Sequence, residues 1–139
     1  MTRCRSYFRA GVKLASVLAL AGLFRSLPAY SGNQIAIMSG ESLDLSTDYY
    51  VANCASLLLN IDGVDLLEGP PGVRLSFRNE LVYARAQRCT VAVPGTITVL
   101  TAPVVSQKIG GQLVYRVRLS TEEGPKIITR TMWVTVYPK

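Results

Sequence analysis

The sequence predicts an all-β fold in which two antiparallel sheets pack as a sandwich of about seven to nine strands with one disulfide. Three observations support this prediction. Apolar and polar residues alternate over most of the chain after residue 31, turn residues interrupt the alternation, and no window there keeps the 3.6-residue period of a helix. Short strands punctuated in this way over about 108 residues are typical of a two-sheet sandwich.

The first 31 residues predict a cleavable signal peptide. Its basic region consists of Arg3, Arg5, Arg9 and Lys13. An uncharged apolar run over residues 14–24 follows, and residues 29–31 are small enough at the required positions for cleavage before Gly32. Because the run is too short to cross a bilayer, we expect no stable membrane span after cleavage. Residues 32–139 should then form a single domain in the periplasm or outside the cell.

Removal of the signal peptide changes the expected charge of the protein. The whole chain has 15 basic and 9 acidic side chains, a net charge of +6. Five of the basic residues and none of the acidic ones precede Gly32, which leaves ten against nine and a net charge of +1. Binding to nucleic acid depends on a basic surface that releases counterions from phosphates. We therefore expect no nucleic-acid partner.

The first expected strands are short. Residues 34–38 and 42–45 flank a turn at Ser39-Gly40, and residues 51–61 form a strand that runs through Cys54. Asp62-Gly63 predicts a hairpin turn before residues 64–67, because Asp-Gly favours the positive φ angles of a tight turn.

The middle of the chain continues in the same way. Gly69-Pro70-Pro71-Gly72 predicts a loop, and residues 73–78 alternate apolar with polar side chains. A strand is expected over residues 81–93, through Cys89, before Pro94-Gly95 turns the chain into residues 96–102.

The C-terminal part predicts an antiparallel hairpin. Residues 112–120 place Leu113, Tyr115, Val117 and Leu119 on one face. Residues 126–137 alternate similarly, except that Arg130 interrupts the apolar face. Residues 121–125 form the turn between them, in which Gly124 can adopt a positive φ.

The two cysteines after residue 31, Cys54 and Cys89, predict a disulfide, since an even pair in an oxidising compartment is usually oxidised. Two buried free thiols are the alternative. The chain has no histidine, and two thiols do not complete a zinc shell, so we expect no metal site. Residues 60–65 carry oxygen ligands at alternate positions that would suit calcium, but the Asp-Gly turn explains the same residues without a metal.

The strand rhythm and the single cysteine pair resemble bacterial secreted domains of the immunoglobulin-like sandwich group. This resemblance implies two sheets of the immunoglobulin type. True immunoglobulin domains place a tryptophan between their cysteines, whereas Trp133 follows both, so the disulfide should join a different pair of strands. The chain also resembles pilins of the chaperone–usher route, which are exported, have an early disulfide and end on a strand with a Tyr near the C-terminus, here Tyr137. This second likeness implies a structural subunit assembled by strand exchange.

Two groups of residues form the candidate binding surface. The basic members are Arg74, Arg78, Arg116 and Arg118, which form a stripe for an anionic partner if their strands share a sheet. Solvated charges on a sheet face are the alternative. The aromatic members are Trp133 and Tyr137, whose phase places them opposite Met132 and Val134, as an exposed ladder for a glycan or a protein. The alternative is a β-bulge near Arg130 that moves Trp133 into the core.

Catalysis is not expected, because the chain lacks histidine and nothing in the sequence brings its carboxylates together. We expect no cofactor. The sequence therefore predicts an exported, non-enzymatic binding module for an unknown protein or glycan. A pilus-type or other structural subunit and a small inhibitor of an exported hydrolase are the alternatives.

Overall fold

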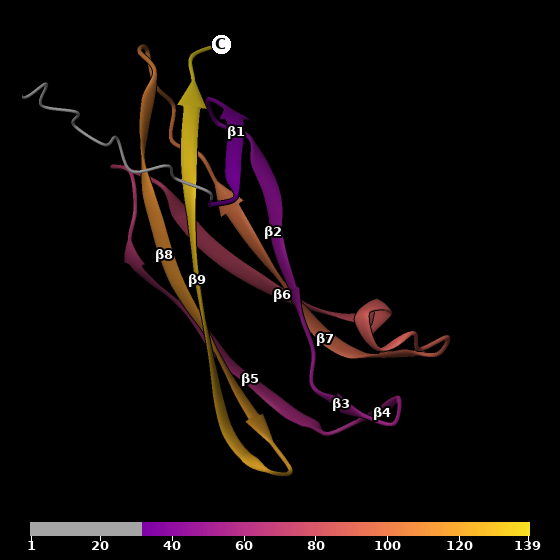
Figure 1. Ribbon diagram of the computed structural model, residues 1–139. Coiled ribbons are helices and arrows are strands. Elements are labelled where there is room, and N and C mark those ends of the chain that lie inside the picture. Colours follow the sequence, from indigo (N-terminus) through magenta and orange to yellow (C-terminus); the bar gives the residue numbers. More distant parts are fainter. Residues whose placement is uncertain (1–31) are drawn as a thin grey trace, which may run out of the picture. The chain divides into compact units, whose positions relative to one another are not determined.

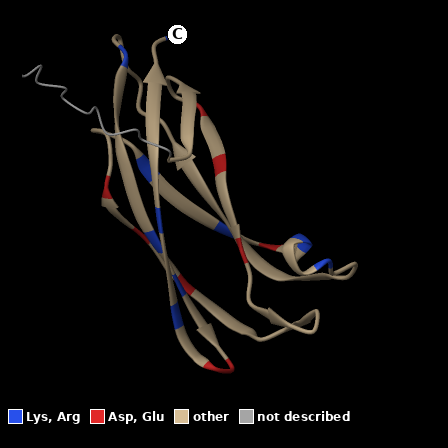
Figure 2. Ribbon diagram, in the orientation of Figure 1, with Lys and Arg blue, Asp and Glu red and all other residues tan. Residues whose placement is uncertain are grey.

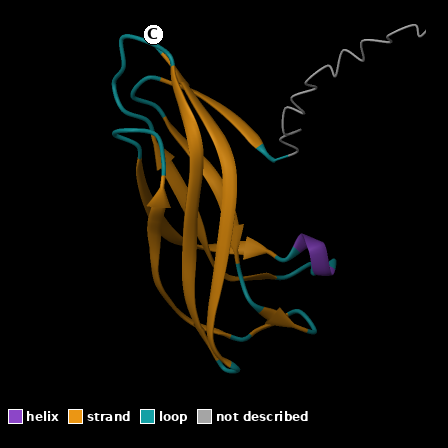
Figure 3. Ribbon diagram, turned by 60° about the vertical axis from the view of Figure 1, so that its left-hand side comes forward, coloured by secondary structure: helices purple, strands orange, loops and turns teal. Residues whose placement is uncertain are grey.

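The computed structural model describes residues 32–139, and the predicted signal peptide lies outside them. These residues form two packed sheets, a two-stranded hairpin and one turn of 3₁₀ helix, η1 (Figures 1 and 3). The elements in chain order are β1 (Gln34–Met38), β2 (Ser42–Asp48), β3 (Val51–Ala52), β4 (Ala55–Ser56), β5 (Leu58–Glu68), β6 (Arg74–Tyr83), η1 (Arg85–Gln87), β7 (Ala92–Thr101), β8 (Ile109–Thr121) and β9 (Gly124–Tyr137). The predicted all-β sandwich is confirmed.

The larger sheet has the strand order β1-β9-β8-β5. Its centre is the predicted C-terminal hairpin, in which β8 and β9 pair from Thr121↔Gly124 to Ile109↔Val136 without a shift in register. Gly124 has a φ of +103°, which a residue with a side chain rarely adopts. β1 runs parallel to β9, and β5 runs antiparallel to β8.

The smaller sheet has the order β2-β7-β6, with both pairings antiparallel. The chain changes sheets between β1 and β2, at a turn where Gly40 has a φ of +74°. When the two-residue strands β3 and β4 are left out, seven strands remain. In chain order the second, fifth and fourth of them form this sheet, and the first, seventh, sixth and third form the other. Constant-type immunoglobulin domains divide their strands between two sheets in the same way, with one exception. Their first strand belongs to the sheet that corresponds to β2-β7-β6. The immunoglobulin-like fold class is thus confirmed by strand order.

The main core lies between the two sheets. Leu113, Tyr115, Val117 and Leu119 of β8 are fully buried, as their alternation predicts. They pack with Leu100 of β7 and with Val134 and Val136 of β9. The opposite side chains of β8 face outward and are partly exposed.

The predicted disulfide is present but it joins two connecting segments. Cys54 lies at the tip of the β3–β4 hairpin, where Asn53 and Cys54 both have positive φ angles. Cys89 lies between η1 and β7, beside a small second core of Val82, Ala84 and Val93. The bond therefore fastens two neighbouring loops at one end of the domain (Figure 3).

Several predicted element boundaries are wrong. Asp62-Gly63 makes no hairpin, because both residues lie within the continuous strand β5. The pairing of β5 with β8 shifts in register between Ile61 and Gly63. Pro94-Gly95 is not a turn but lies within β7. The single strands expected through Cys54 and through Cys89 are both interrupted at those residues, because the chain forms the β3–β4 hairpin at the first and the η1 loop at the second.

Candidate binding face

The four arginines of the candidate surface do not form one stripe. Arg74 and Arg78 belong to β6 in the smaller sheet, whereas Arg116 and Arg118 belong to β8 in the larger sheet. The condition for a continuous basic stripe, a shared sheet, is therefore not met. Figure 2 shows the basic residues in separate places with acidic neighbours.

Arg78 is held by acidic side chains on both sides. Its guanidinium donates two hydrogen bonds to the Asp44 carboxylate, at 2.8 and 2.7 Å, and its Nε donates to Glu80 at 3.0 Å. The Asp44 pair crosses over β7, since Asp44 lies in β2 on the far side. The hydrogen bond from Arg78 lowers the pKa of Asp44 below its ordinary value.

Arg116 and Arg118 share one carboxylate. Arg118 Nε donates to Asp65 at 2.8 Å, and Arg116 Nε donates to the same oxygen at 3.3 Å. These contacts, with that of Arg118 the largest, lower the pKa of Asp65. Three of the four arginines thus have acidic partners within the domain, which favours the interpretation of a solvated sheet face.

Trp133 and Tyr137 lie on the outer face of β9, and each is 39% exposed. The alternative in which a bulge moves Trp133 into the core is wrong, because β8 and β9 keep their register throughout. Arg130 remains on the inner face and donates a hydrogen bond to the buried carboxylate of Asp48. A partner for its charge, and not a bulge, explains the arginine in an apolar position.

The surroundings of these two rings carry no acidic or basic side chain on the same strands. β1 has none, β8 has none before Arg116, and β9 has none after Arg130 (Figure 2). Register places Gln34 of β1 and Gln112 of β8 on either side of Trp133. We call this surface the aromatic face; it consists of Gln34, Ala36, Met38, Gly110, Gln112, Val114, Thr131, Trp133, Thr135 and Tyr137.

The absence of a side chain at Gly110 shapes the aromatic face. A Cβ atom there would lie 3.5 Å from the indole Nε1 of Trp133 and 3.3 Å from the carbonyl oxygen of Val134. The ring therefore has room beside β8. At the end of the face the Lys108 ammonium lies 5.2 Å from the centre of the Tyr137 ring, a cation–π contact.

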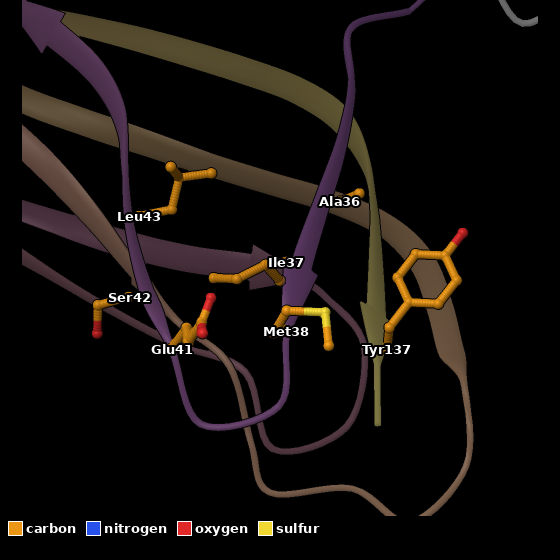
Figure 4. Close-up of a pocket in the computed structure, with 7 residues that line it drawn as sticks. All are labelled: Ala36, Ile37, Met38, Glu41, Ser42, Leu43 and Tyr137. Carbon is orange, nitrogen blue, oxygen red and sulfur yellow. The ribbon is translucent and has the colours of Figure 1, made fainter. Parts of the chain in front are cut away.

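A shallow pocket of about 180 Å³ adjoins the aromatic face where β1 turns into β2. Ala36, Met38 and Tyr137 belong to both, and Figure 4 shows the tyrosine ring along one side of the pocket. Glu41 is the acidic group in its lining, and it forms an ion pair with Lys139 at 3.6 Å. The sequence gives no signal for this pocket, because β1 and β9 become neighbours only through parallel pairing of the two ends of the domain.

The residues considered for calcium have other partners. Asp62 accepts hydrogen bonds from Asn60 and Ser120, at 3.1 and 2.7 Å. Asp65 is occupied by the two arginines described above. Within residues 32–139, no three acidic or cysteine side chains are grouped as metal ligands would be, and no helix is long and apolar enough to span a membrane.

Comparison with family models, with curated proteins and with solved structures finds no match for this chain. The likeness to immunoglobulin domains therefore concerns fold class alone, and a fold of this class carries no function by itself. Any assignment of function has to come from the surface of the domain.

Proposed function

We propose that the domain is an exported, non-enzymatic binding module that recognises a protein or a glycan through the aromatic face. The observation that carries this proposal is the pair of partly exposed rings, Trp133 and Tyr137, on one regular strand. Such rings combine a large apolar area with a polar tip, and they lose little conformational freedom on binding.

Within this proposal, the chemistry of the aromatic face favours a neutral glycan. The aromatic face supplies amide and hydroxyl groups from Gln34, Gln112, Thr131 and Thr135 and has no charged member, and the Lys108 ammonium contacts the Tyr137 ring at its end. Sugar rings present apolar C–H faces bordered by hydroxyl groups, which match a ring flanked by neutral hydrogen-bonding side chains. Because paired strands hold the backbone of these residues in place, binding orders few additional groups.

The arrangement of the larger sheet gives less support to a subunit assembled by strand exchange. β9 has a neighbour on both sides, β1 and β8, so the described domain leaves no vacant strand position beside its C-terminal strand. An inhibitor that acts through a single loop has no support in the surface either, since the Gly69–Gly72 segment packs Pro70 into the domain.

The experiment uses Trp133 as its own reporter, because it is the only tryptophan in the chain. The purified protein is titrated with a panel of neutral oligosaccharides while tryptophan fluorescence is recorded. We expect a saturable change with at least one sugar and a loss of binding of about tenfold or more, measured by calorimetry, in Trp133→Ala and Tyr137→Ala. Tyr83→Ala is the matched control, because Tyr83 is an exposed aromatic residue of the smaller sheet.

Two results would count against the proposal. If every sugar leaves the fluorescence unchanged, the glycan assignment is wrong. If a sugar binds with the same affinity to Trp133→Ala as to the unchanged protein, a different surface binds it.

A further inference from the structure

The four edge strands of the sandwich differ in how well they are protected against pairing with another chain. β1 has only five residues, β2 shifts register between Asp44 and Ser46, and β5 shifts at three places. β6 is ten residues long, contains no proline and pairs with β7 without any shift. Short length and bulges prevent strand addition, whereas a long regular edge invites it. Among the described edge strands, β6 is therefore the one that neither short length nor a shift in register protects.

The side chains of β6 leave apolar surface uncovered. Leu75 packs against the main core, and Phe77 and Leu81 follow on the same face of the strand because their spacing is even. Phe77 is nevertheless 40% exposed and Leu81 67% exposed. Unlike Leu75, these two side chains do not belong to the main core, and they remain open to solvent along the edge strand.

The opposite face of β6 carries charges of both signs. Arg78 and Glu80 lie two residues apart on either side of Asn79. In an antiparallel pair of two identical strands centred on Asn79, each Arg78 lies opposite Glu80 of the other copy, and each Phe77 lies opposite Leu81. Directly opposed charges of opposite sign and opposed apolar side chains both stabilise an antiparallel pair.

We propose that two copies of this chain associate through β6, antiparallel and with Asn79 opposite Asn79. The two smaller sheets then form one continuous six-stranded sheet. This contact is isologous, since the same strand contributes from both copies, and it closes without leaving a β6 edge for a third copy. Registers centred on Arg78 or on Glu80 oppose two like charges, which disfavours them.

The two-fold axis of such a pair is perpendicular to the shared sheet. Both larger sheets therefore lie on the same side of it, and the two aromatic faces point away from the shared sheet in the same general direction. A dimer of this form presents two equivalent surfaces to one extended ligand, which raises avidity without a new contact. The association itself does not depend on what the aromatic face binds.

The first experiment is sedimentation velocity on the protein purified after expression of the full chain. A contact along one strand is at the small end of specific interfaces, so we expect a dissociation constant of about 1–100 μM. The mass should rise toward twice that of the monomer across this range. Leu81→Lys places a charge on the apolar face of the edge and should leave a monomer. Ile127→Lys is the matched control and should still dimerise, since Ile127 is an exposed apolar residue of β9 in the other sheet.

Two further variants test the register. Glu80→Arg opposes two arginines across the pair and should abolish the dimer. Asn79→Cys places two thiols on the axis at a separation that a disulfide can span, and peptide mapping should find the 79–79 cross-link. Thr129→Cys, in β9, should give none.

Each outcome decides the proposal. A protein that remains monomeric at about 1 mM, well above the expected constant, overturns it. A dimer that survives Leu81→Lys and gives no 79–79 cross-link shows that copies associate through another surface, and this also overturns it.

Discussion

Replacing Arg130 by methionine should be one of the most damaging single changes on β9. Arg130 donates a hydrogen bond to Asp48, and the side chain of Asp48 is only 1% exposed. The other Asp48 oxygen accepts from the Ser46 hydroxyl at 2.9 Å, and that hydroxyl accepts from the buried Tyr115 at 3.0 Å. Arg130 and Tyr115 belong to the larger sheet and Ser46 and Asp48 to the smaller one, so this network joins the two sheets.

The expected loss of stability follows from the group that the substitution leaves without a partner. Arg130→Met has a similar length but leaves the Asp48 carboxylate buried without its charged partner, which costs about 3–5 kcal/mol. A domain of this size has a total stability of about 5–15 kcal/mol, so the variant should be close to unfolding or melt at least about 12 °C lower. Asp48→Asn should cost less, about 1–3 kcal/mol, because the Arg130 side chain that loses its partner is 38% exposed, whereas that of Asp48 is 1% exposed.

Urea unfolding followed by Trp133 fluorescence measures these changes, with circular dichroism as a second probe. The double variant Asp48→Asn with Arg130→Met should be more stable than Arg130→Met alone, with a coupling energy of at least about 1 kcal/mol. If Arg130→Met costs less than about 1 kcal/mol and the two changes are additive, the buried carboxylate does not depend on Arg130 and the reasoning is wrong.

Three further predictions concern the disulfide, the close packing at Gly95 and the stability of the domain at low pH. The double variant Cys54→Ser with Cys89→Ser should lower the free energy of unfolding by up to about 4 kcal/mol, because the bond closes a loop of 35 residues. A loss below about 1 kcal/mol, measured by urea unfolding, would show that the disulfide contributes little to the stability of the domain. Gly95→Ala should lower the free energy of unfolding by about 1–3 kcal/mol in the same assay, since its Cβ atom would lie 2.5 Å from Val82 Cγ2 and 2.9 Å from the Asp48 carbonyl oxygen. Gly111→Ala is the control and should cost less, because the nearest atom to its Cβ would be 3.4 Å away. Equal losses in the two variants would contradict the reasoning. The lowered pKa values of Asp44 and Asp65 mean that the folded state favours their charged forms, so this stabilisation is full above pH 3.8 and is lost as the pH falls below it. When the pH is lowered from 7, the urea concentration at the midpoint of unfolding should fall less in Asp65→Asn than in the unchanged protein. An equal fall in both proteins would refute the role of Asp65.

Local pattern was sufficient for the parts of the fold in which neighbouring residues along the chain decide the structure. The β8–β9 hairpin was predicted because alternation on both sides of one glycine turn defines its two strands, and the structure supplies their register. The Cys54–Cys89 bond was predicted from cysteine count and compartment. For Trp133 the alternation left open an outward position and a bulge that moves it into the core, and the structure shows the outward position.

Local pattern failed where a contact between distant residues changed the outcome. Asp-Gly at residues 62–63 is a common hairpin turn, yet pairing with β8 keeps β5 as one strand. Pro94-Gly95 reads as a turn, yet it lies within β7 opposite Leu81 and Glu80. Arg130 suggested a bulge because its partner, Asp48, is 82 residues away in the sequence.

The sequence by itself determined the all-β class, the hairpin at the C-terminal end and the cysteine pair, because each depends on spacing along neighbouring segments or on residue count. For Trp133 the spacing left two positions open, and the tertiary structure decided for the outer face. Only the tertiary structure decided which strands share a sheet. That assignment separated the four arginines, paired β1 with β9 to form the aromatic face, and left β6 at an open edge. Sheet membership depends on hydrogen bonds between segments far apart in the chain, and a period of two residues says which face a side chain occupies but not which strand lies beside it.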